Sequence, residues 1–89
     1  MAPKELEKML KALANHRRIL ILRYLKEKKE ATVGDIAHAI KLSFKSTSRH
    51  LSVLASRGIL ENDQRSTQIF YHIAPNLPEP LCKFISLVM

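Results

Sequence analysis

The 89-residue sequence lacks the features that commonly mark an enzyme or a metal protein. Its two glycines, Gly34 and Gly58, are too few for a glycine-rich loop that cradles phosphate. Its single cysteine, Cys82, excludes an intrachain disulfide and a metal site built from several thiolates of one chain. There is also no Ser/His/Asp arrangement. We therefore expect no enzymatic activity and no cofactor, and we interpret Cys82 as a small buried hydrophobe.

Long apolar runs are absent too. None reaches the roughly 18–20 residues needed to span a membrane, and no signal peptide precedes the first predicted helix. We therefore expect a soluble cytoplasmic protein. Yet 46% of the residues are hydrophobic, and a chain this short buries only about 60–65% of the surface that its unfolded form exposes. We predict one domain over residues 1–89 that covers its surplus apolar surface by forming a homodimer.

Acidic residues are missing from the middle of the chain. The formal net charge is +7. Residues 36–60 contain no Asp or Glu, and they contribute Lys41, Lys45, Arg49 and Arg57. A surface charged in this way attracts polyanions. The expected partner is nucleic acid rather than an anionic membrane, because the basic stretch leaves no large apolar face for lipid.

Residues 42–58 predict a helix with two distinct faces. Ser43 can cap its N-terminus, and Gly58 suits the positive φ that often follows a helix. Thr47, Leu51 and Leu54 recur at helical spacing, which predicts a stripe facing the core. The opposite face carries side chains that are cationic or small and hydrogen-bonding, namely Lys45, Ser46, Ser48, Arg49 and Ser52. Such a face suits a helix in a DNA groove, and the simpler alternative is a solvated face.

The residues before this helix predict three more helices. An amphipathic helix covers about residues 3–14, and a largely apolar one, capped by Asn15, covers about 16–29. Thr32 is the candidate cap of a short third helix. Because only a brief turn separates this helix from the next, we predict a helix-turn-helix over about residues 34–57.

The residues after the helix-turn-helix predict a hairpin and a last helix. A polar, turn-forming stretch at 63–67 precedes the alternating residues 68–73, so we predict a two-stranded wing over about 60–73 with Arg65 near its tip. An apolar helix then covers about 77–89. Both terminal helices carry apolar stripes, and we expect them to form the dimer across a two-fold axis. The candidate interface residues are Leu6, Met9, Leu10, Leu81, Phe84, Ile85 and Val88.

The predicted fold is mainly α with a small β-hairpin, in the order α-α-β-α-α-β-β-α. With this order, the sequence resembles the ArsR-type winged helix-turn-helix repressors. The matching segments read LKALANHRRIL at 10–20, LSFKSTSRHLSVL at 42–54, GIL at 58–60 and IFYHI at 69–73. The resemblance implies a dimeric prokaryotic transcriptional repressor that binds an inverted repeat in double-stranded DNA, with the terminal helices forming the dimer.

The resemblance also suggests roles for individual residues. Arg49 is the expected reader of guanine, because a guanidinium can bond O6 and N7 together. We expect Phe44 to pack at the helix start, with a thymine-methyl contact as the alternative. Lys41 and Arg65 are expected to contact phosphates, and His50 to pack or to contact a phosphate. The full predicted DNA-binding set is Lys41, Ser43, Phe44, Lys45, Ser46, Ser48, Arg49, His50, Ser52 and Arg65.

Metal binding, which releases DNA in many members of that family, is not expected here. One type carries a Cys pair where this chain has residues 32–35, and another carries Asp, His and Glu on the last helix, where residues 81–89 supply none. Two other functions stay open, a winged-helix protein-interaction module and a non-specific nucleic-acid binder. RNA is the less suitable nucleic acid, because its major groove is too narrow for a helix.

Overall fold

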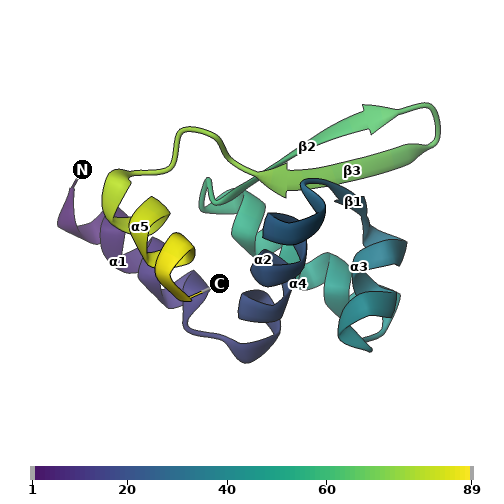
Figure 1. Ribbon diagram of the computed structural model, residues 1–89, viewed down its shortest axis with the longest axis horizontal. Coiled ribbons are helices and arrows are strands. Elements are labelled where there is room, and N and C mark those ends of the chain that lie inside the picture. Colours follow the sequence, from purple (N-terminus) through teal and green to yellow (C-terminus); the bar gives the residue numbers. More distant parts are fainter. Residues whose placement is uncertain (1, 89) are drawn as a thin grey trace.

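The computed structural model describes residues 2–88, which form a group of helices with a small sheet along one side (Figure 1). The order of elements is the predicted one, α-α-β-α-α-β-β-α. Their bounds are α1 (Pro3–Leu13), α2 (His16–Lys28), β1 (Ala31–Thr32), α3 (Val33–Ile40), α4 (Phe44–Ser56), β2 (Leu60–Arg65), β3 (Gln68–Ile73) and α5 (Glu79–Val88). No helix within these residues is long and apolar enough to cross a membrane.

Helix α2 lies in the core because apolar side chains surround much of its length. Its Ile21 and Leu22 are fully buried, and Leu25 is 1% exposed. The predicted cap forms at its start, where Asn15 Oδ1 accepts a hydrogen bond from the backbone N–H of Arg18 at 3.2 Å. The buried cluster also takes in residues of the other four helices, namely Ala12, Leu13, Ile36, Ile40, Leu51, Leu54 and Leu81.

Helices α3 and α4 form the predicted helix-turn-helix. The Thr32 hydroxyl accepts from the N–H of Asp35 at 3.2 Å and caps α3, and the Ser43 hydroxyl accepts from the N–H of Ser46 at 3.1 Å and caps α4. Lys41 adopts a left-handed conformation with φ of 57° between them. This conformation ends α3 and allows the short turn into α4.

The wing is an antiparallel hairpin in which β3 occupies the centre of a three-stranded sheet, with the order β1-β3-β2. The pairing runs from Leu60 opposite Ile73 to Arg65 opposite Gln68. The polar residues 63–65 therefore belong to the strand, and the turn is shorter than the predicted 63–67. Ser66, with φ of 59°, supplies the positive φ that a two-residue hairpin loop needs.

The terminal helices α1 and α5 lie at one end of the long axis, and the tip of the wing lies at the other (Figure 1). Leu81 and Ile85 are 1% and 5% exposed, so these two predicted interface residues belong to the core of the protomer itself. The apolar side chains that stay exposed at this end are Leu10, Phe84 and Leu87. Leu87 was not among the predicted interface residues.

Two further expectations fall on α5. Cys82 is exposed, so its interpretation as a buried hydrophobe is wrong. It follows the buried Leu81 by one residue, and successive helical side chains point in directions about 100° apart. The side chain of Val88, a predicted interface residue, lies outside the described part of the structure.

Thr47 generates a prediction about stability. Its side chain is fully buried on α4, yet its hydroxyl oxygen has no hydrogen-bond partner in the described residues. A buried hydroxyl without a partner costs about 1–3 kcal/mol. Thr47→Val keeps the shape and removes the hydroxyl, so we expect the free energy of unfolding in urea to rise by about 1 kcal/mol.

The control is Thr47→Ala, which also removes a methyl group and should unfold more readily than the valine variant. All variants must be compared at one protein concentration, because dimerisation would shift the apparent stability. A valine variant less stable than the wild type would show that the hydroxyl is satisfied in solution.

Candidate nucleic-acid interface

The outward face of α4 gathers half of the predicted DNA-binding residues. Thr47, Leu51 and Leu54 are buried on the inner side of the helix. The opposite side therefore faces away from the core, and it exposes Lys45, Arg49 and Ser52, with Ser46 and Ser48 half-buried at its borders. We call these five residues the reading face. One helix thus presents a row of cationic and hydroxyl side chains to the exterior.

The cations around this face are not neutralised by the protein. Within residues 2–88, the recorded ion pairs leave out Lys41, Lys45 and Arg49. Lys41 is exposed in the turn just before α4. Their positive charges are therefore available to a polyanion.

Phe44, the first residue of α4, does not pack as expected. Its side chain is 63% exposed. It borders a groove of about 320 Å³ between the start of α4 and the wing, where Ile69 of β3 is also largely exposed. The expectation of packing is therefore wrong. Phe44 follows the spacing of the buried stripe, but it lies one turn before Thr47, the first buried residue of α4, and borders the open groove instead. The other residues that line the groove are Thr32, Val33, Gly34, Thr67 and Gln68.

Arg65 lies at the end of β2, near the wing tip, and is held by two carboxylates. Its Nη1 and Nη2 donate to the two carboxylate oxygens of Glu30 at 2.6 and 2.8 Å. Its Nε donates to Asp63 at 3.0 Å, and its guanidinium carbon lies 4.6 Å from the centre of the Phe70 ring. The hydrogen bonds that Arg65 donates to Glu30 and then to Asp63 raise the pKa of Arg65, and the bond to Glu30 lowers the pKa of Glu30.

This arrangement makes Arg65 less accessible to DNA than its prediction as a phosphate contact assumed. Its charge is already balanced, so a phosphate must displace Glu30 or Asp63 to reach it with full effect. Local sequence patterns do not reveal this pair, because Glu30 and Arg65 are 35 residues apart.

The start of α2 lies next to α4. Arg18 Nε donates to His50 Nδ1 on α4 at 3.2 Å, and Arg18 Nη1 donates to the carbonyl of Ala12 on α1 at 3.3 Å. Arg17 Nη1 donates to the carbonyl of Ile40 at the end of α3 at 3.5 Å. Both arginines therefore hold other helices in place, a role that sequence analysis missed.

His50 is a packed residue rather than a solvated one. It is half-buried, and its imidazole accepts the bond from Arg18. Burial lowers the pKa of His50, and so do the positive charges of Arg18, Arg17 and Arg49. The imidazole is consequently neutral at pH 7, as an acceptor at Nδ1 must be.

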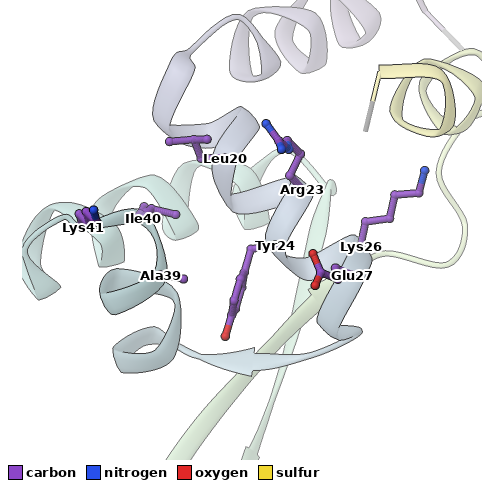
Figure 2. Close-up of a pocket in the computed structure, with 8 residues that line it drawn as sticks. All are labelled: Leu20, Arg23, Tyr24, Lys26, Glu27, Ala39, Ile40 and Lys41. Carbon is purple, nitrogen blue, oxygen red and sulfur yellow. The ribbon is translucent and has the colours of Figure 1, made fainter.

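A larger groove lies elsewhere, between α2 and α3, with a volume of about 600 Å³ (Figure 2). Figure 2 shows the Tyr24 ring extending from α2 beside Ala39 of α3, while the ends of Arg23, Lys26 and Lys41 diverge. Small-molecule sites bring a few polar groups together at one point. This groove does not, so it is not the candidate site.

The histidines do not gather into a ligand cluster. His16, His38, His50 and His72 lie on α2, α3, α4 and β3 respectively. His72 lies 3.2 Å from a carboxylate oxygen of Glu61. Across residues 2–88, no group of three or more His, Cys, Asp or Glu side chains is placed to hold a metal ion.

Residues 15–62 match the family model for "Bacterial regulatory protein, arsR family". The arsenical resistance operon repressor of Escherichia coli K12 is 31% identical over 77 residues, which are 86% of this chain and 66% of that protein. The transcriptional activator HlyU of Vibrio cholerae is 33% identical over 66 residues, 74% of this chain and 60% of that protein. The chain thus spans about three fifths of the length of these curated relatives.

Solved structures agree with these matches. HlyU of Vibrio cholerae superposes with a TM-score of 0.83 and 28% identity, over 99% of this chain and 94% of that chain. Mb0332 of Mycobacterium bovis is a homodimeric winged helix-turn-helix DNA-binding domain of a possible ArsR-family regulator. It superposes with a TM-score of 0.81 and 33% identity, over 96% of this chain and 75% of that chain.

The Glu30–Arg65 pair generates a prediction. Each phosphate that a cation neutralises adds about −0.9 to the slope of log affinity against log salt, so six to eight contacts give about −5 to −7 for duplex DNA. Glu30→Gln removes the charge of one of the two carboxylates that hold Arg65, which leaves the guanidinium more available to a phosphate. We expect a slope about one unit steeper than in the wild type, measured on a duplex of arbitrary sequence.

The matched control is Glu79→Gln on α5, which makes the same change in charge and also breaks an ion pair, to Lys83 at 3.1 Å. It should leave the slope near the wild-type value. If both variants steepened the slope equally, net charge rather than the release of Arg65 would be the cause.

Proposed function

The chain belongs to the arsR family of bacterial regulatory proteins, and we propose that it is a sequence-specific DNA-binding transcriptional regulator that acts as a repressor. The observation that carries this proposal is the reading face of α4. Lys45, Arg49 and Ser52 are exposed there, and residues 36–60 contain no acidic side chain to repel phosphate. A helix of this kind suits the major groove, which is wide enough to admit it.

We further propose that the protein acts as a homodimer on an inverted repeat in the bacterial cytoplasm. Support comes from the exposed Leu10, Phe84 and Leu87 on the terminal helices and from the homodimeric state of the Mycobacterium bovis domain. Two-fold symmetry would place two copies of α4 in successive major grooves. The half-sites would then lie about 34 Å apart, or a multiple of this distance.

We also propose that this repressor works without the metal sites common in its family. Residues 32–35 are Thr-Val-Gly-Asp, where the thiolate type has its Cys pair. Residues 81–88 include none of the Asp, His and Glu that another type has on its last helix. Any signal that releases this protein from DNA would then act without these metal sites.

One observation favours a second function, a protein-interaction module. Phe44 is 63% exposed and Ile69 is 43% exposed, on either side of the groove between α4 and the wing. Exposed apolar side chains of this size are common at protein interfaces. The cationic and hydroxyl side chains that dominate the reading face favour DNA.

The test compares two cations near α4 on a duplex selected from a random library. Arg49→Ala should cost about 1–3 kcal/mol of binding free energy on that duplex and relax preference at one base pair, because Arg49 is the proposed guanine reader. Lys41→Gln should weaken binding to the selected and to a scrambled duplex alike, because a phosphate contact carries no sequence information.

Both variants can be followed by fluorescence anisotropy at one fixed salt concentration. Equal losses on both duplexes for Arg49→Ala would contradict the base-reading role. Unchanged binding of both variants to every duplex would favour the protein-interaction alternative.

A further inference from the structure

The first turn of α2 breaks an ordinary rule of helix electrostatics. A helix has partial positive charge at its N-terminus, which favours acidic residues there. This turn instead carries His16, Arg17 and Arg18 and no acidic residue. The arrangement is unfavourable by itself, so the side chains must be stabilised by groups outside α2.

Those groups are carbonyls at the C-terminal ends of two other helices, α1 for Arg18 and α3 for Arg17. The last carbonyls of a helix lack partners within it and carry partial negative charge. In α1, the carbonyls of Leu10 and Lys11 accept from the N–H of Ala14, and that of Leu13 accepts from the N–H of Asn15. The carbonyl of the remaining residue in this turn, Ala12, accepts from Arg18 Nη1 at 3.3 Å.

The same guanidinium makes a second bond in another direction. Arg18 Nε donates to His50 Nδ1 on α4 at 3.2 Å. One rigid, planar side chain therefore joins the end of α1 to the middle of α4. On α4, His50 is the immediate neighbour of Arg49, the proposed guanine reader.

We propose that Arg18 is a positioning residue for DNA reading: by bonding Ala12 and the neutral imidazole of His50 together, it fixes the direction in which α4 presents Arg49. This inference rests on the proposed function. It assigns Arg18 no contact with DNA. Helix α1 is one of the two proposed dimer helices. The bond from Arg18 to Ala12 therefore also connects the reading face to the dimer interface, which sets the distance between the two copies of α4 and hence the spacing of the half-sites.

The protonation state of His50 controls this contact. Nδ1 can accept only while it carries no proton. The charged groups that face the imidazole are Arg17 and Arg18 of α2 and Arg49 of α4, all cations, which together with burial lower the pKa of His50. The contact therefore persists from neutral pH down to below the ordinary histidine pKa of about 6.5 and is lost on further acidification.

The experiment measures specificity, defined as the ratio of affinities for a selected and a scrambled duplex, at about pH 7.5 and at a pH about one unit below the pKa that an NMR titration gives for His50. The ratio cancels the general gain in DNA affinity that any added positive charge brings. Loss of one hydrogen bond of about 1–1.5 kcal/mol corresponds to a roughly tenfold change. We expect the wild-type ratio to fall roughly tenfold on acidification.

Two variants separate positioning from mere stability. Arg18→Met keeps the length of the side chain but cannot donate, and we expect it to show the low ratio at both pH values. His50→Gln offers an amide oxygen that accepts but does not titrate, and we expect it to hold the high ratio at both. A purely structural role for Arg18 would not make the pH dependence vanish in His50→Gln.

A readout without DNA completes the test. In an NMR titration, the pKa of His50 should rise in Arg18→Met, because a facing cation has been removed. If Arg18→Met left the pKa of His50 or the specificity ratio unchanged, the positioning role of Arg18 would be wrong, and the proposed function would still stand. If the wild type preferred no duplex at neutral pH, the proposed function would fail, and the inference with it.

Discussion

The structure depends on the burial of one side of α4 against the central helix α2. Leu51 and Leu54 are fully buried there, and burial of each leucine side chain contributes about 1.5–3 kcal/mol. A helix that is held on one side only must leave its other side outside. Because the buried stripe fixes the rotation of α4 about its own axis, it also decides that Lys45 and Arg49 point outward. Core packing and DNA reading are thus two consequences of one sequence pattern.

Arg17, Arg18 and Arg65 differ from Arg49 in their partners. Arg17, Arg18 and Arg65 each donate to carbonyls, an imidazole or carboxylates of the protein itself. Arg49 forms no ion pair within residues 2–88. The overall positive charge therefore overstates what is available to DNA, because part of it is used to hold helices and the wing in place. Lys41, Lys45 and Arg49, which take part in no recorded ion pair within residues 2–88, lie on or beside the reading face.

The fold could be predicted from local spacing, and the site only in part. The caps Asn15 and Ser43 and the buried stripe of α4 follow from neighbouring residues, so sequence was enough. The Arg18–His50 bond joins residues 32 positions apart, and it depends on how α2 and α4 pack. Phe44 and Cys82 were misjudged for a related reason. Their residue types suggest burial, but Phe44 lies at the first residue of α4, before the buried stripe begins, and Cys82 lies beside the buried positions of α5 rather than on them.

The central claim is that a pair of α4 helices, related by two-fold symmetry, reads double-stranded DNA. It is tested most directly by selecting bound sequences from a random duplex library with the purified protein and no added metal. The account predicts enrichment of an inverted repeat whose half-sites lie one helical turn, about 34 Å, or a multiple of it apart. Recovery of unenriched sequences, or of a single half-site without symmetry, would contradict it.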